Sequence, residues 1–276
     1  MIKTFVKKAL KEDIGRGDLF SLVGKNSFAS ASITCKDEGI FAGRAYVKRL
    51  CKMNKLDISF RVKDGDAIHQ GDIIAVIEGK SKAILRCERV MLNMMQHASG
   101  IASNVARYKK ALEGYAVKLL DTRKTRPHLR VFEKYAIRCG GGTNHRMGLD
   151  DCLMIKDTHL KTIDDLKQFM QEARAKLPFT CKIEIECEAV EFAKFAMQCG
   201  ADIIMCDNMA CEDIIQVVAY KQAHFPHVLL EASGNITQES IVSYAKTGVD
   251  AISSGSLIHQ ATWLDFSMRI THKTLK

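Results

Sequence analysis

The chain has 276 residues, which exceeds the usual single domain and predicts one large barrel or two domains. Hydrophobic residues make up 47% and charged residues 26% of the chain, a globular composition that excludes a mainly disordered state. The net charge of +9 is compatible with nucleic acid, anionic lipid or anionic small molecules as partners, and the distribution of the charge must decide among them.

The first hundred residues predict a small α+β domain. Residues 1–13 mix lysines with apolar residues at helical spacing, which indicates an amphipathic helix rather than a secretory signal. A strand is expected over Ala29–Lys36, a helix over Arg44–Met53, and hairpins between Val62 and Glu78. The sequence holds no run of about 18 apolar residues, so no membrane span is expected. Ten cysteines without a CxxC pair favour reduced thiols in a cytoplasmic protein.

A long helical pattern covers Ile84 to about Leu112, and we expect Ser99-Gly100 to break it in two. From Val117 onward, short apolar runs alternate with helical patterns, which predicts a parallel sheet in a barrel or in an open doubly wound fold. The sequence has no GxGxxG after the first strand, which argues against dinucleotide binding. The six expected strands are Val117–Leu120, Leu153–Ile155, Ile183–Cys187, Ile203–Cys206, Val228–Leu230 and Ala251–Ile252.

Each of these apolar runs ends in polar residues that are able to do chemistry. In a barrel the carboxyl ends of the strands meet at one mouth, where active sites lie, so the pattern favours a catalytic barrel over a structural one. Glu184 and Glu186 share one side of their strand, and such carboxylates need cations or a divalent metal nearby. The last two strand ends, Ser233-Gly234-Asn235 and Ser254-Gly255-Ser256, precede helices, and the pair favours a phosphate site.

Basic residues gather around a glycine-rich loop in the middle of the chain. Between Arg123 and Arg146 the sequence holds seven Lys or Arg residues and one acid, Glu133. This loop is not aromatic-rich, which weakens a nucleic-acid interpretation. Together with His145 and Lys156, the two arginines indicate a pocket for carboxylates, which arginine binds in a bidentate way.

Motifs along nearly the whole chain, in the right order, resemble the quinolinate phosphoribosyltransferase family. The resemblance implies an N-terminal α/β open sandwich plus an incomplete (β/α) barrel of the type II phosphoribosyltransferase kind. We therefore expect the sandwich over 1–100, joined by a C-terminal helix over 262–276, and the catalytic barrel over 101–261. The motifs that carry the resemblance are Cys87–Arg89, Ser99–Ala102, Asp121–Pro127, Gly141–Leu149, Ile155–His159, Ile183–Glu186, Met205–Asn208, Leu230–Gly234 and Ser254–His259.

The resemblance further implies transfer of phosphoribosyl from phosphoribosyl pyrophosphate to quinolinate. The products would be nicotinate mononucleotide, pyrophosphate and CO₂, on the de novo route to NAD, with Mg²⁺ as cofactor. The quinolinate carboxylates would be bound by Arg89, Arg123, His145, Arg146 and Lys156. Phosphoribosyl pyrophosphate would be bound by Lys124, Glu186, Asp207, Ser233, Gly234 and Gly255, with His259 close by.

Among these residues, the resemblance implies catalytic roles for Lys124, Glu186 and Asp207, and metal binding by Glu186 and Asp207, directly or through water. The protein is expected to form at least a homodimer in which Arg89 reaches the neighbouring subunit's site. Two positions depart from the family pattern, because Asn235 and His128 stand where the family often has glycine.

Three alternatives remain open on the sequence alone. A related barrel could accept a monocarboxylate such as nicotinate, although the number of cations favours a dicarboxylate. A lyase barrel would use Lys156 for a Schiff base. A non-catalytic protein would use the positive charge to bind nucleic acid. Residue spacing also leaves open whether Glu184 or Glu186 lies nearer the mouth.

Overall fold

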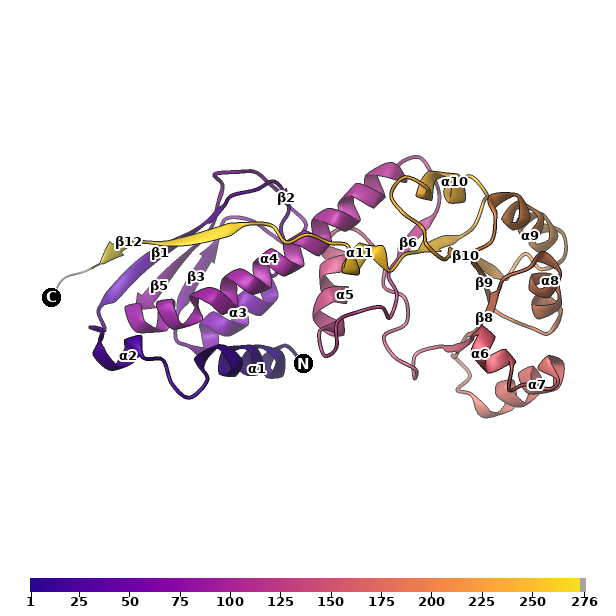
Figure 1. Cartoon of the computed structure of the whole chain (residues 1–276), viewed down its shortest axis with the longest axis horizontal. Helices are drawn as coiled ribbons and strands as arrows, with labels where there is room; N and C mark the ends of the chain where they lie inside the picture. The colour runs from indigo at the N-terminus through magenta and orange to yellow at the C-terminus, as the bar shows by residue number, and fades with distance from the viewer. Residues whose placement is uncertain (274–276) are drawn as a thin grey trace. The chain divides into compact units, whose positions relative to one another are not determined.

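The structure, a computed structural model, describes residues 1–273. The chain divides into two compact units (Figure 1). The first unit comprises residues 1–106, 138–141 and the C-terminal segment from Ala261. The second comprises residues 107–137 and 142–260. Within the described residues, no helix is long and apolar enough to cross a membrane.

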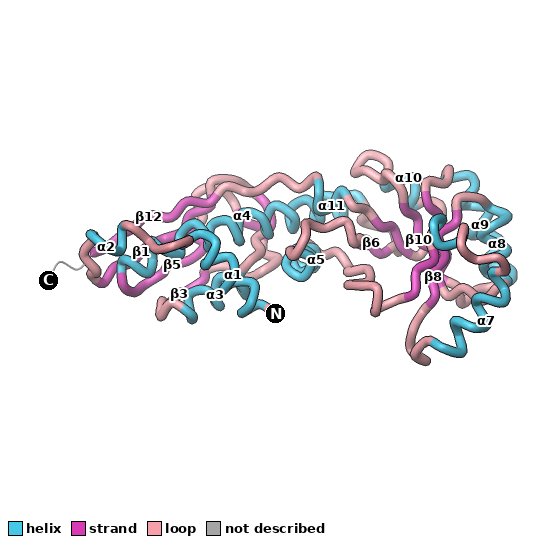
Figure 2. The backbone as a smooth tube through the Cα atoms, turned by 60° about the horizontal axis from the view of Figure 1, so that its bottom comes forward, coloured by secondary structure: helices cyan, strands magenta, loops and turns pink. Residues whose placement is uncertain are grey.

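The first unit is built on a four-stranded antiparallel sheet in the order β12-β1-β5-β3 (Figure 2). Alternate residues of β1, from Ala29 to Cys35, are buried, because one face of the strand covers the core. The strands are β1 Phe28–Cys35, β3 Asp57–Phe60, β5 Ile73–Lys80 and β12 Phe266–Lys273, and β2 Gly39–Ile40 pairs with β4 Ala67–Ile68. The helices are α1 Ile2–Ile14, α2 Phe20–Val23, α3 Arg44–Met53 and the start of α4 Ser81–Ala111.

The C-terminal segment is a strand, so the expected helix over 262–276 is wrong. Strand β12 pairs antiparallel with β1, with Met268 opposite Ile33. The segment alternates Phe266, Met268 and Ile270, which is the period of a strand, and β1 supplies the edge that it needs. The last three residues of the expected helix lie outside the described residues.

Helix α4 runs unbroken through Ser99-Gly100, so the expected break is wrong. The Ser99 hydroxyl accepts the Ala42 N–H at 2.9 Å and donates to the Ala42 carbonyl at 3.2 Å. A Cβ atom on Gly100 would lie 2.2 Å from the Thr262 carbonyl oxygen. These small residues therefore let the chain pack closely on the helix and do not end it. The expected boundary between residues 100 and 101 falls inside this helix.

The second unit is built on six parallel strands in the order β6-β11-β10-β9-β8-β7. Strands that follow one another in sequence are neighbours except for β6 and β7, which form the two edges. This is the order of a barrel that stays open between its first two strands, and it confirms the expected α/β fold. The strands are β6 Lys118–Leu120, β7 Leu153–Ile155, β8 Ile183–Cys187, β9 Ile203–Asp207, β10 Leu229–Ser233 and β11 Ala251–Ser253.

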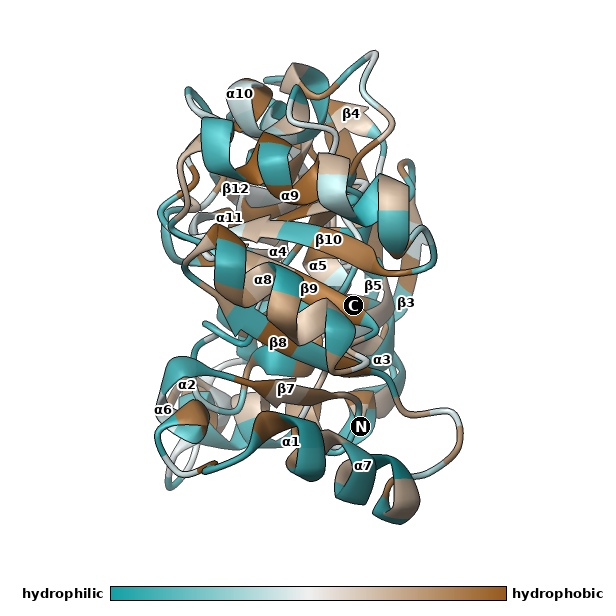
Figure 3. Cartoon of the chain, turned by 90° about the vertical axis from the view of Figure 1, so that its right-hand side faces the viewer, coloured by the Kyte–Doolittle hydropathy of each residue, from teal (hydrophilic) through white to brown (hydrophobic). Residues whose placement is uncertain are grey.

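Helices connect these strands, and α8 packs on β8 and β9 (Figure 3). Strand β8 is buried along its whole length, whereas α8 and α9 mix hydrophobic and hydrophilic residues. The helices of the second unit are α5 Arg130–Cys139, α6 Asp157–Leu160, α7 Leu166–Lys176, α8 Val190–Gln198, α9 Cys211–His224, α10 Ile241–Ala245 and α11 Ser256–His259, with the last residues of α5 in the first unit.

Candidate active site

A cavity of about 530 Å³ opens at the carboxyl ends of the six parallel strands. Side chains from every strand end reach it, as the sequence pattern predicts for a barrel mouth. Two further lining residues, His145 and Arg146, come from the loop between α5 and β7. The strand-end residues that line the cavity are Thr122, Arg123, Lys124, Lys156, Glu186, Asp207, Ser233 and Ser253.

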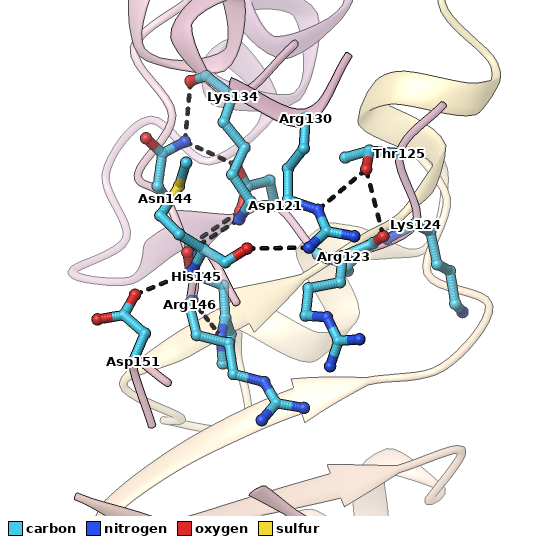
Figure 4. A network of polar contacts seen from close by, with 12 residues as sticks. Asp121, Arg123, Lys124, Thr125, Arg130, Lys134, Asn144, His145, Arg146 and Asp151 are labelled. Atoms are coloured by element: carbon cyan, nitrogen blue, oxygen red, sulfur yellow. Dashed lines mark hydrogen bonds and ion pairs between the residues drawn. The ribbon is translucent and has the colours of Figure 1, made fainter. Parts of the chain in front are cut away.

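Arg123 and Arg146 form the cationic wall of this cavity and extend in the same direction (Figure 4). Neither guanidinium group makes an ion pair with a carboxylate within residues 1–273, although Arg146 donates to the Cys152 carbonyl at 2.9 Å. Burial, together with the charges of Arg146 and Arg130, lowers the pKa of Arg123. Two neighbouring cations without acidic partners make an anion-binding wall.

A buried network fixes the two chain segments that carry these arginines. Asp121 follows β6 and forms an ion pair with Lys134 of α5, and both side chains are fully buried. Asp121 also accepts the His145 N–H at 2.8 Å and the Asn144 side-chain N–H at 2.6 Å, and Lys134 donates to the His145 carbonyl at 2.9 Å. Burial raises the pKa of Asp121 and lowers that of Lys134, and their pairing opposes both shifts. The ion pair thus joins β6, α5 and the loop at His145.

Lys156 and Glu186 are joined by an ion pair at the carboxyl ends of β7 and β8. The Lys156 N–H donates to His159 Nδ1 at 2.9 Å, which fixes the start of α6. Residue spacing alone did not decide which of the two carboxylates of β8 lies nearer the mouth. In the structure, Glu186 lines the cavity, whereas Glu184 is fully buried beneath it.

Glu184, His145 and Glu231 form a buried cluster at the base of the cavity. The His145 Nε2 atom lies 3.2 Å from an oxygen of each carboxylate. Burial by itself would lower the pKa of His145, but the two glutamates outweigh it and raise the pKa to about 10. Burial and the charge of Glu231 raise the pKa of Glu184. The cluster therefore keeps one more proton near neutral pH than these groups would in water.

The contacts of His145 fix the orientation of its ring. Its Nδ1 atom accepts the Arg146 N–H at 2.7 Å, so the ring's own proton is on Nε2, facing the glutamates. The three ligand-type atoms also lie within 4.8 Å of one another, but an Nε2 that carries a proton has no lone pair for a metal.

A second cavity of about 220 Å³ adjoins the first, and the two predicted phosphate loops line it. Gly234 has φ +94°, and a Cβ atom there would lie 2.4 Å from the Asn208 side chain. A Cβ atom on Gly255 would lie 2.9 Å from the Lys124 side chain. Both glycines therefore allow close approach. The loop residues Ser233, Gly234, Asn235, Ser254 and Gly255 line this cavity together with Lys124 and His259.

The two departures from the family pattern have one physical feature in common. Asn235 has φ +49° and His128 has φ +62°, the left-handed region that glycine enters without strain. Asparagine tolerates this conformation better than histidine does. The Asn235 side chain also donates to Asn208 at 3.0 Å, which holds the phosphate loop against the end of β9.

Comparison with known proteins covers both units. Residues 101–269 match the model of the quinolinate phosphoribosyl transferase C-terminal domain, and residues 18–99 match that of its N-terminal domain. The chain belongs to the quinolinate phosphoribosyltransferase family.

Full-length relatives support this membership. The probable nicotinate-nucleotide pyrophosphorylase [carboxylating] of Bacillus subtilis is 41% identical, over 98% of this chain and 93% of that protein. The corresponding protein of Synechocystis is 37% identical, over 98% and 92% of the two chains. Among solved structures, NadC from Streptococcus pyogenes is 39% identical with a TM-score of 0.90, and it covers 97% of this chain and 95% of that one.

Most of the site residues expected from the quinolinate phosphoribosyltransferase resemblance lie together, and one does not. Arg89 is an exposed residue of α4 in the first unit and lines neither cavity. The sequence interpretation left out Glu231, Thr122 and Ser253, which line the main cavity. The sequence shows that these residues lie at strand ends. Which of them face the cavity depends on the order of the strands in the sheet, which the sequence does not show.

Proposed function

We propose that this quinolinate phosphoribosyltransferase binds quinolinate in the 530 Å³ cavity and phosphoribosyl pyrophosphate across both cavities. Its activity is that of a carboxylating nicotinate-nucleotide pyrophosphorylase, which converts quinolinate to nicotinate mononucleotide in NAD synthesis. The observation that carries the substrate assignment is the pair of arginines on one wall, Arg123 and Arg146, which form no ion pair with a carboxylate of residues 1–273. A dicarboxylate offers one carboxylate to this wall and a second one to the remaining cation of the cavity, Lys156.

The proposed quinolinate pocket uses three cations of the cavity. Arg123 and Arg146 bind one carboxylate from the wall. Lys156 binds the other, and it shares its charge with Glu186 until the substrate arrives. His145 supports the pocket from below, because both of its ring nitrogens already bond to the protein. Arg89 completes the pocket from a neighbouring subunit of a homodimer, a proposal that rests on the family resemblance.

The proposed phosphoribosyl pyrophosphate site uses the second cavity for the 5′-phosphate, at Ser233, Gly234 and Gly255, with His259 beside them. Lys124 lines both cavities, so it is placed to neutralise the pyrophosphate. Glu186 and Asp207 offer carboxylate oxygens, which suit Mg²⁺, and the ion would keep waters and bind the substrate's phosphates. Since Glu186 is paired with Lys156 and Asp207 with Asn208, water-mediated contacts fit best. When bound, Mg²⁺ stabilises the charge of the leaving pyrophosphate.

The reaction follows from positioning two anions that otherwise repel each other. The quinolinate nitrogen attacks the anomeric carbon, and the bond to pyrophosphate breaks. Glu186 and Asp207 stabilise the positive charge that develops on the ribose. The pyridinium ring then accepts the electron pair of the bond to the adjacent carboxylate, CO₂ leaves, and a proton takes its place on the ring carbon. We further propose a cytoplasmic location, which the ten free cysteines support.

The test is the release of pyrophosphate from phosphoribosyl pyrophosphate and Mg²⁺ with quinolinate or nicotinate as the acceptor. We expect release with quinolinate, in step with CO₂, and none with nicotinate. Release with nicotinate alone would overturn the dicarboxylate pocket. No release with either acceptor would overturn the proposed substrates, and a borohydride trap at Lys156 would then test the lyase alternative.

A further inference from the structure

A fully buried ion pair lies behind the cationic wall and does not itself line the cavity. Asp121 and Lys134 are each 0% exposed, and neither is among the residues that line the main cavity. A buried ion pair contributes little net stability compared with an apolar pair of the same shape. The Asp121–Lys134 pair is therefore better explained by the chain segments that it holds in place than by a contribution to stability.

The pair joins two segments that are far apart in the sequence. The Asp121 N–H donates to the Thr143 carbonyl at 3.2 Å, and the Thr143 N–H donates to the Leu119 carbonyl at 2.8 Å, so residues 143–145 run beside the end of β6. The Asp121 carboxylate then accepts the His145 N–H and the Asn144 side chain. One carboxylate thus fixes the segment that leads to Arg123 and the segment that ends at Arg146.

Helix α5 supplies the other half of the attachment. Lys134 donates to Asp121 and to the His145 carbonyl, and its own carbonyl accepts the Asn144 side chain at 2.9 Å. Figure 4 shows these bonds behind Arg123 and Arg146, whose guanidinium groups extend away from the network. Because Arg123 and Arg146 repel each other, something else in the protein must hold them side by side before an anion binds.

We propose that Asp121, Lys134 and Asn144 are positioning residues that hold Arg123 and Arg146 at the spacing needed to bind one carboxylate of quinolinate together. The inference rests on the proposed function. At metal sites, loss of the groups that orient the binding side chains typically costs 10- to 100-fold in affinity, and we expect a comparable effect here. The phosphate loops follow β10 and β11 and are not part of this network. Only Lys124 of the proposed phosphoribosyl pyrophosphate site lies on the segment that Asp121 fixes, so the affinity for this substrate should change less than that for quinolinate.

The experiment measures the dissociation constants of quinolinate and of phosphoribosyl pyrophosphate by calorimetry on the purified full chain. The first variant, Asn144→Ala, keeps the ion pair. The second, Asp121→Asn with Lys134→Met, removes both charges and so leaves no unpaired buried charge that would prevent folding. The control is Asp202→Asn, which removes a carboxylate bonded to Arg174 and to the Ile183 N–H, each at 2.6 Å, at the opposite end of the sheet.

We expect both network variants to bind quinolinate at least 10-fold more weakly and phosphoribosyl pyrophosphate within about threefold of the wild type, by the positioning argument. The control should bind both ligands as the wild type does. Equal weakening for both ligands, or quinolinate binding within twofold of the wild type in both network variants, would overturn the inference. Absence of quinolinate binding by the wild type would instead overturn the proposed function on which it rests.

Discussion

Replacing Arg123 with methionine should weaken quinolinate binding and at the same time stabilise the free protein. Methionine keeps much of the length of the side chain and removes its charge. In the structure the Arg123 Nε atom is buried without a hydrogen-bond partner, and the neighbouring Arg146 and Arg130 repel its charge. The arginine is therefore unfavourable for folding, and its presence needs a functional reason.

The expected magnitudes follow from these contacts. A charge-assisted hydrogen-bonded pair contributes about 1.5–3 kcal/mol, so the dissociation constant of quinolinate should rise about 10- to 150-fold. Relief of the repulsion and of the unpaired Nε atom should raise the free energy of unfolding by about 1 kcal/mol, which corresponds to a Tm increase of roughly 2–4 °C.

Calorimetric titration with quinolinate and a thermal scan of the free protein measure the two effects. Arg123→Lys is the matched control, because it keeps the charge and loses the bidentate geometry. It should recover only part of the affinity, and it should gain less stability than Arg123→Met because it keeps the charge that Arg146 and Arg130 repel. A fall in Tm for Arg123→Met, or an unchanged dissociation constant, would refute the assignment of Arg123 to an anion-binding wall.

Three further predictions concern stability. The pKa of His145 is raised above its value in the unfolded chain, so its contribution is fully present below about pH 6.5 and is lost as the pH rises toward about 10. Denaturant unfolding from pH 6 to 10 should therefore show a decrease in the free energy of unfolding that is absent in His145→Gln. His128→Gly should raise the free energy of unfolding by about 1 kcal/mol, since His128 has φ +62°, whereas Asn235→Gly should change it little. Gly100→Ala should destabilise by about 2–3 kcal/mol, because its Cβ atom meets the Thr262 carbonyl, and a normal urea midpoint would contradict the close packing on α4.

Local patterns were sufficient for the second unit. Its strands are short apolar runs that end in polar residues, and β7 and β8 begin and end at the residues expected from the sequence. Parallel strands place their carboxyl ends at one edge, so Lys156, Glu186 and Asp207 could be placed together before any contact was known.

The features that sequence reasoning missed depend on contacts between distant residues. Strand β12 pairs with β1, more than 230 residues earlier, and no local signal selects that edge. Ser99-Gly100 has the composition of a helix end, but Ala42 and Thr262 pack against it and the helix continues. Glu184 and Glu186 have the same side chain and lie on the same side of β8. They differ only in their depth along the strand, so Glu184 contacts His145 and Glu186 lines the cavity.

The charged residues discussed in the second unit fall into two groups, those that are buried in ion pairs and those that have no oppositely charged partner. Lys134 and Asp121 are buried together, so their charges cancel and cannot attract a ligand. Arg123 and Arg146 have no carboxylate partner within the described residues, so their charges remain available to an anion. A dicarboxylate that binds there completes a set of ion pairs that the protein leaves incomplete, which explains why a cationic wall is kept at a cost in stability. Removing both cations together should therefore give a protein that no longer distinguishes quinolinate from uncharged pyridines.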